Sequence, residues 1–172
     1  EENALGLELM AAHASAQAVQ QESISQDKVS IIEHPDVRRM LMTVKAQQEG
    51  CRALLFSTAY LIDKENQAEG DARKRLSTRI GLLTPICKAY GSEVGFQACS
   101  TAMQVFGGYG YCSEYGVEQL VRDARIAAVY EGTNGIQAID LLFRKVAADQ
   151  GAELKSVLGE VGKFAAGKQG SC

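Results

Sequence analysis

The run Tyr130-Glu131-Gly132-Thr133-Asn134 places one carboxylate between an aromatic ring and a glycine, at the junction of two predicted helical segments. An adjacent ring can desolvate a carboxyl group, and desolvation raises its pKa toward the range where it removes protons efficiently. Glu131 is therefore a candidate general base. The same run also suits a helix start, because Glu131 or Thr133 could cap the first turn. Both interpretations stay open at this point.

Two further segments are unusual for a plain helical bundle. Gly107-Gly108-Tyr109-Gly110-Tyr111 follows a long amphipathic segment, and such glycines either let a ligand approach the backbone or simply end a helix. Their spacing matches neither a dinucleotide-binding fingerprint nor a P-loop, and no strand precedes them. Arg122-Asp123-Ala124-Arg125 is most simply a solvated helix face with a local ion pair. Taken one at a time, both segments favour a structural role.

Taken together, in this order and spacing, these segments closely resemble the C-terminal helical domain of the acyl-CoA dehydrogenases. The resemblance runs from about Tyr90 to Val146 and has four linked motifs, which are Gln104 to Tyr111, Glu114 to Leu120, Arg122 to Ile126, and Tyr130 to Gln137. Upstream, His34-Pro35-Asp36-Val37-Arg38-Arg39-Met40-Leu41 is similar to the branch that includes the methylmercaptopropionyl-CoA dehydrogenases.

The resemblance implies a role for each matching residue. Glu131 would be the catalytic base that removes the α-proton of an acyl-CoA thioester while FAD accepts the β-hydride, and Tyr130 and Gly132 would line the acyl pocket. Thr133, Asn134 and Gly135 would meet the FAD nucleotide near its phosphates, at a helix start that offers backbone amides to an anion. The segment that would reach the FAD of a neighbouring subunit consists of Gln104, Val105, Phe106, Gly107 and Gly108.

The resemblance also implies an FAD-dependent oxidoreductase of fatty acid metabolism, with an acyl-CoA substrate, an electron-transfer flavoprotein as partner, and a homodimer or homotetramer as the assembly. An N-terminal helical domain and a middle β-domain would complete the enzyme. Taken alone, the chain is expected to show no turnover and little FAD binding, because the isoalloxazine would have one wall only. Two alternatives stay open. One is an acyl-CoA oxidase, in which dioxygen reoxidises the flavin, and the other is a non-catalytic relative that serves oligomerisation or DNA binding.

The elements that position these residues are predicted to be helices. Apolar residues recur at helical spacing in five segments, which are Leu5 to Gln21, Pro35 to Ile62, Leu76 to Phe106 with Pro85 inside it, Val117 to Arg125, and Glu131 or Thr133 to Val146. Asp71 is expected to cap the third segment, and Gly107 to Gly116 to form a turn. The predicted fold is an all-α, up-and-down helical bundle over residues 1–150, with a weakly helical extension of the same domain over 151–172.

Composition narrows the function classes further. The 172 residues are 46% hydrophobic and 23% charged with two prolines, which is typical of one globular domain rich in long helices. A formal charge of -3 argues against nucleic-acid binding, and no apolar run is long enough to span a membrane. Five cysteines without a Cys-x-x-Cys pair predict a reducing compartment, for which we expect the cytoplasm. His13 and His34 lie far apart and no cysteine stands at ligand spacing, so no metal site is predicted.

Overall fold

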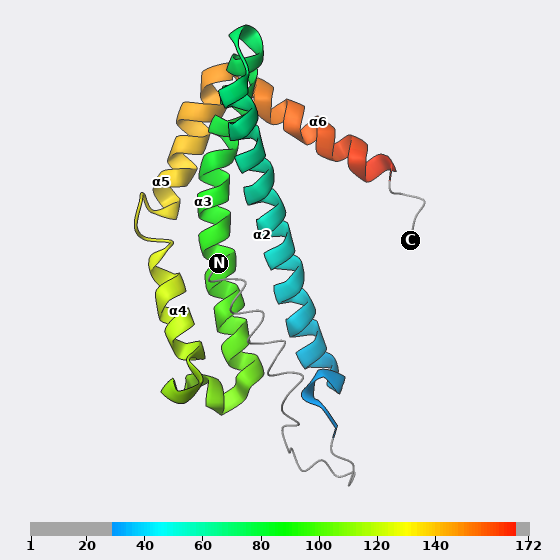
Figure 1. Cartoon of the computed structure of the whole chain (residues 1–172), viewed down its shortest axis with the longest axis vertical. Helices are drawn as coiled ribbons and strands as arrows, with labels where there is room; N and C mark the ends of the chain where they lie inside the picture. Colours follow the sequence, from blue (N-terminus) through cyan, green and yellow to red (C-terminus); the bar gives the residue numbers. More distant parts are fainter. Residues whose placement is uncertain (1–28, 168–172) are drawn as a thin grey trace. The chain divides into compact units, whose positions relative to one another are not determined.

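The computed structural model describes residues 29–167 of the chain (Figure 1). Every regular element in this range is a helix and none is a strand, which confirms the predicted all-α class. The helix predicted from Leu5 to Gln21 lies outside the described residues. Among the helices of residues 29–167, none combines the length and the apolar character that a membrane crossing requires.

The first long helix, α2 (Pro35–Gln67), begins where the sequence predicts. Pro35 takes the first helical position, where its missing N–H removes no intrahelical bond, and the Arg38 N–H donates to the His34 carbonyl at 3.0 Å. A short 3-10 helix, η1 (Ile31–Glu33), precedes it. The buried positions of α2 follow the predicted stripe and are Met40, Val44, Cys51 and Thr58. Leu55 and Ile62 belong to the same predicted stripe but are exposed.

The second long helix, α3 (Gly70–Phe106), ends where the sequence predicts but begins earlier. Because α3 already begins at Gly70, Asp71 lies in its first turn rather than at the cap that we expected. Pro85 is buried inside the helix, which continues past it. Proline has no backbone N–H, so this turn of α3 lacks one ladder hydrogen bond.

The helices contribute to two compact units, each assembled from separate stretches of chain. Within the described residues, unit 1 comprises residues 29–53 and 90–131, and unit 2 comprises residues 54–89 and 132–167. In unit 1 the first half of α2 packs antiparallel to the second half of α3, with Gln47 Nε2 donating to Gln97 Oε1 at 3.4 Å and Cys51 lying against Gly91. In unit 2 a buried contact of 3.3 Å joins Thr58 Oγ1 of α2 to Cys87 Sγ of α3.

The core of unit 1 gathers where α2, α3 and α4 (Val117–Ile126) meet. Val44, Ala102 and Val117 are at most 3% exposed and form one cluster. The segment predicted as a turn consists of two short 3-10 helices, η2 (Gly107–Tyr111) and η3 (Ser113–Tyr115), separated by Cys112. The Tyr115 ring contacts the Phe106 ring edge-on, with centroids 6.5 Å apart, and both rings pack against the core cluster.

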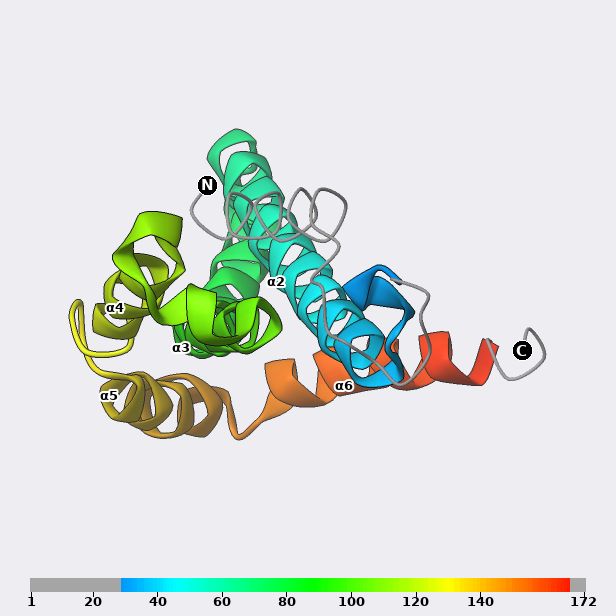
Figure 2. The same ribbon diagram turned by 90° about the horizontal axis from the view of Figure 1, so that it is seen from below.

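Unit 2 ends in a chain of helical segments that changes direction once. The α-helix α5 (Asn134–Ile139) continues as a π-helical segment, η4 (Asp140–Val146), then η5 (Ala147–Asp149) and α6 (Ala152–Gly167). Gln150 and Gly151 both have positive φ, and Figure 2 shows the resulting bend. Asp149 caps α6 by accepting hydrogen bonds from the backbone N–H groups of Gly151 and Glu153 at 3.0 and 2.9 Å.

The α6 helix is better formed than its weak sequence pattern predicts. Arg79 of α3 forms ion pairs with Glu153 and Glu160, which lie on one face of α6. The residues of the frayed end predicted after Gly167 lie outside the described range. The division of the chain into residues 1–150 and 151–172 stays a prediction.

Candidate functional site

Glu131 lies just after α4, in a backbone conformation that side chains rarely adopt. Its φ is +55°, and among the non-glycine residues of the described chain it shares a positive φ with Gln150. A left-handed conformation costs a residue with a Cβ about 1–2 kcal/mol, so it persists where the surrounding structure imposes it. An observed outlier of this kind is a pointer to function.

The side chains of Tyr130 and Glu131 are exposed in unit 1, and Tyr130 is 50% accessible. The desolvation that we expected from the neighbouring ring is therefore not supplied by the described part of unit 1. Enzymatic proton abstraction takes place in a site closed to bulk water, so catalysis at Glu131 requires a further surface that covers it.

The turn that follows Glu131, Gly132–Asn134, belongs to unit 2 and is stabilised by contacts with α5. Gly132 has a φ of +83°, and a Cβ at this position would approach Gln137 Nε2 to 3.0 Å. Thr133 Oγ1 accepts a hydrogen bond from the Ile136 N–H at 3.3 Å, so Thr133 is the N-cap of α5. Of the two caps that the sequence left open, Thr133 is the one observed at the start of α5.

Asn134 is tied to a residue that the sequence did not point to. Lys88 of α3 donates from Nζ to Asn134 Oδ1 at 2.9 Å, within unit 2. The two residues are 46 positions apart. A single lysine in an amphipathic helix carries no signal of such a contact, which is why sequence reasoning missed it.

The predicted residues Gln104 to Gly108 lie in unit 1, where α3 ends and η2 begins. The fold explains why two positions of this cluster are glycines. Gly107 has a φ of +62°, and a Cβ at Gly110 would meet the Met103 carbonyl oxygen at 2.7 Å. Gly108 has no positive φ, and a Cβ added there would meet no atom within 4 Å, so the fold does not explain this glycine.

The charged run on α4 is a solvated helix face, as its composition predicts. Arg122 Nε lies 2.8 Å from Glu118 Oε2, one turn earlier, and Gln119 Nε2 donates to Asp123 Oδ1 at 2.8 Å. The Arg125 guanidinium stacks 5.2 Å from the centre of the Phe96 ring. These contacts stabilise unit 1 locally and leave Arg122 largely exposed.

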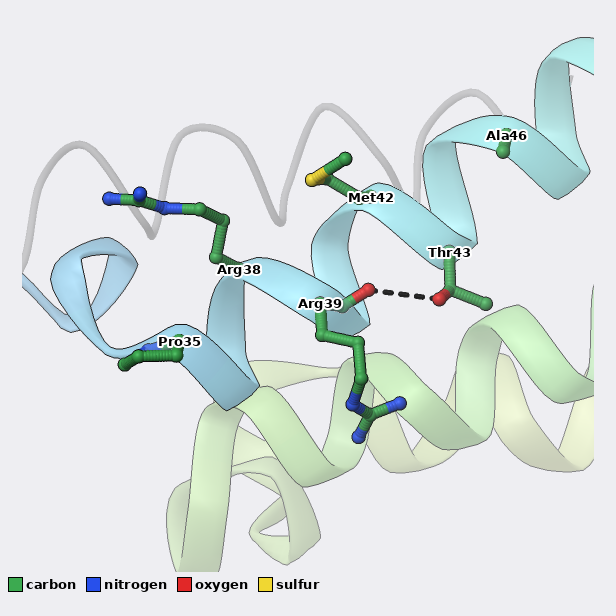
Figure 3. A pocket seen from close by; sticks show the side chains of 6 residues that line it. All are labelled: Pro35, Arg38, Arg39, Met42, Thr43 and Ala46. Carbon is green, nitrogen blue, oxygen red and sulfur yellow. Dashed lines mark hydrogen bonds between the residues drawn. The ribbon is translucent and has the colours of Figure 1, made fainter.

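A shallow hollow on the first turns of α2 contains none of the predicted site residues (Figure 3). Its lining residues are Pro35, Arg38, Arg39, Met42, Thr43 and Ala46. Thr43 Oγ1 donates to the Arg39 carbonyl at 2.9 Å across one turn of the helix. The charge of Arg39 is paired with Asp36. Within residues 29–167, no cluster of three or more metal-ligating side chains occurs.

Comparison with known proteins places these observations in a family. Residues 5–145 match the model of the acyl-CoA dehydrogenase C-terminal domain. The chain is 42% identical over 142 residues to a butyryl-CoA dehydrogenase of Syntrophomonas wolfei, covering 82% of this chain and 23% of that protein. It is 44% identical over 127 residues to the 3-methylmercaptopropionyl-CoA dehydrogenase of Ruegeria pomeroyi, covering 74% of this chain and 22% of that protein.

A solved structure agrees with the sequence relatives. The butyryl-CoA dehydrogenase of Megasphaera elsdenii superimposes with a TM-score of 0.59 at 26% identity, over 81% of this chain and 33% of that one. The chain therefore spans about a quarter of the length of the curated relatives that it matches. The family match, the relatives and the all-helical structure lead to one conclusion: the chain belongs to the acyl-CoA dehydrogenase family and contains its C-terminal domain.

Proposed function

We propose that this chain acts as part of an FAD-dependent acyl-CoA dehydrogenase, in which Glu131 removes the α-proton of the acyl-CoA substrate. The observation that carries the proposal is the left-handed backbone of Glu131, directly before the Gly132–Thr133 turn. Such a conformation is costly for a glutamate, and the cap of α5 comes from Thr133 instead. We attribute the presence of a glutamate in this unfavourable conformation to a requirement for a carboxylate at position 131.

The reaction divides between this chain and its cofactor. An α-proton beside a thioester is weakly acidic, so the base must be held close to the carbon and kept from water. Glu131 takes up the proton on its carboxylate, while Tyr130 and Gly132 line the acyl chain beside it. FAD, when bound, supplies the acceptor for the hydride that leaves the β-carbon.

The residues near the start of α5 fit the nucleotide part of FAD. Thr133 and Gly135 are exposed at the start of α5, where the first N–H groups have no acceptor within the helix and the Ile136 N–H is already bonded to Thr133 Oγ1. A Cβ at Gly135 would approach Thr133 Oγ1 no closer than 3.7 Å, so Gly135 is another glycine without a packing reason. A glycine of this kind suits a backbone that a ligand approaches closely.

Assembly and location follow from two other observations. The apolar residues of α5 and η4 are exposed in this chain, namely Ile136, Ile139, Leu142 and Phe143. An apolar face of this kind marks an interaction surface, and we assign it to a homodimer or homotetramer. Cys51, Cys87, Cys99 and Cys112 are free thiols, which favours a reducing compartment such as the cytoplasm. An electron-transfer flavoprotein is the proposed acceptor of the electrons.

The test uses the full-length flavoprotein and a Glu131→Gln variant. Anaerobic mixing with acyl-CoA thioesters, butyryl-CoA among them, should bleach the flavin absorption of the wild type. Loss of the base should slow this reduction at least about 100-fold, because a positioned general base contributes two to four orders of magnitude. The matched control is Glu114→Gln, which neutralises an exposed carboxylate of η3.

The outcomes separate the proposal from its alternatives. Reduction of Glu131→Gln at the wild-type rate would refute the assignment of the base. A wild-type flavin that no acyl-CoA thioester reduces would refute the dehydrogenase itself. Peroxide release in air that matches substrate consumption, without an electron-transfer flavoprotein, would identify an oxidase instead.

A further inference from the structure

The hydrogen bond from Lys88 to Asn134 connects two helices of unit 2 at the turn that follows Glu131. Lys88 comes from the middle of α3 and is half-buried, and Asn134 is the first residue of α5. The ammonium group of lysine can only donate, so Asn134 must turn its carbonyl oxygen toward Lys88 and its amide N–H donors away. The bond therefore fixes the orientation of the Asn134 side chain as well as its position.

The turn needs such an anchor because its backbone is unfavourable. Glu131 and Gly132 are consecutive residues with positive φ, +55° and +83°. The left-handed conformation is costly for Glu131, which carries a Cβ, but not for Gly132, so the Glu131 conformation depends on contacts that hold the turn. The Thr133 cap comes from the start of α5 itself, so it sets the local shape of the turn.

The Lys88 bond ties the turn to a second helix. It joins the turn to α3, a long helix, through a charge-assisted hydrogen bond of 2.9 Å in a half-buried setting, where solvent screens it less than at the surface. A bond from a neighbouring long helix restricts how far the turn can shift as a whole.

We propose that Lys88 is a positioning residue for Glu131: it holds Asn134 and thereby the Gly132–Asn134 turn to which the Glu131 backbone is directly joined. This inference rests on the function proposed for Glu131. Loss of the anchor lets the carboxylate sample positions away from the α-carbon, and a misplacement of about 1 Å can slow a reaction by up to 100-fold.

The experiment compares full-length Lys88→Met, Lys88→Arg and Asn134→Ala flavoproteins and the Lys88→Met/Asn134→Ala double variant. Flavin reduction is measured at saturating acyl-CoA, with FAD content and KM recorded for each protein. We expect Lys88→Met to reduce flavin about tenfold more slowly with FAD content and KM within about twofold of wild type. Lys88→Arg keeps a cationic donor and should recover most of the rate.

The double variant tests whether Lys88 acts through Asn134. Because both single variants remove the same bond, adding Lys88→Met to Asn134→Ala should change the rate less than about twofold. Lys74→Met is the matched control, since Lys74 is an exposed lysine on the same helix, and it should reduce flavin at the wild-type rate.

Three results would overturn the inference: a wild-type rate for Lys88→Met, no recovery in Lys88→Arg, or independent effects of the two substitutions. If Lys88→Met does not fold, Lys88→Ala takes its place in the cycle, because it also removes the donor to Asn134. Failure of the proposed function is recognised separately, since the wild type would then not be reduced or Glu131→Gln would be as fast as wild type.

Discussion

Single residues of the glycine cluster differ in what they do, although the sequence presents them as one motif. Gly107 supplies a left-handed turn after α3, Gly110 lets the 3-10 helix η2 pack onto α3, and Gly108 has no packing reason. This sorting needs the backbone angles and the neighbouring atoms, which sequence spacing does not contain. The motif therefore combines a structural requirement with a position open to a ligand.

Gly110→Ala should destabilise the chain, because a methyl group would meet the Met103 carbonyl oxygen at 2.7 Å and Phe106 Cβ at 2.8 Å. Overpacking of a well-packed position costs about 1–3 kcal/mol, which urea unfolding would detect as a lower midpoint with an unchanged slope. Gly108→Ala is the control and should stay within about 0.5 kcal/mol of wild type, since it meets nothing within 4 Å. Equal midpoints for the two variants would contradict this account of Gly110.

At the same scale, the sequence points to Glu131 as a candidate base, which stays a prediction, and it does not point to Lys88. The Tyr-Glu-Gly-Thr spacing identified the carboxylate as a candidate base and Thr133 as a candidate cap. The left-handed backbone of Glu131 and its exposure in this chain required the structure. Lys88 could not be found, because contacts between residues far apart in the chain depend on how two helices pack.

At the scale of elements, the helix boundaries were largely predictable from local chemistry. Pro35 begins α2 as expected, α3 ends at Phe106 where the glycines start, and Thr133 caps α5. The prediction failed where a long-range contact overrides a weak local signal. The α6 helix is the clearest case, since its docking depends on Arg79, more than 70 residues earlier in the chain.

Arg79→Met should loosen α6. The Arg79 side chain is 22% exposed and pairs with Glu153 and Glu160, so its removal leaves α6 without its ionic anchor on α3. Because partly exposed ion pairs contribute little, hydrogen exchange of the α6 amides should accelerate by only about two- to fivefold. Arg75→Met, an exposed arginine one turn earlier on α3, is the control. Unchanged exchange in α6 would show that the ion pairs do not hold it.

The same anchor should weaken in acid. The hydrogen bond and the charge of Arg79 hold the pKa of Glu160 below its ordinary value. A carboxylate with a lowered pKa in the folded state stabilises the fold at higher pH and loses that contribution as pH falls through its folded pKa. Protection of α6 should therefore decline below about pH 4 in the wild type, and this decline should be absent in Arg79→Met.

At the scale of the whole molecule, the apolar face of α5 and η4 predicts an assembly. Phe143 is 71% exposed, and Phe143→Lys places a charge on this face. In the full-length protein we expect sedimentation to show an association constant lowered at least about tenfold, which corresponds to about 1.4 kcal/mol. Met42→Lys is the control, because Met42 is similarly exposed on α2. An intact oligomer with a lower melting temperature would instead mean that another part of the same polypeptide covers the face.

The two-unit organisation has a consequence for synthesis on the ribosome. Each unit joins an early stretch of chain to a late one, residues 29–53 with 90–131 and residues 54–89 with 132–167. Within residues 29–167, the core cluster at Val44 of α2 is complete only when Ala102 and Val117 emerge, more than 50 residues later. During that interval a nascent helix with an uncovered apolar stripe is exposed to aggregation and to chaperones. Translation pauses placed before residue 102 should therefore lower the yield of folded protein more than pauses placed after residue 131.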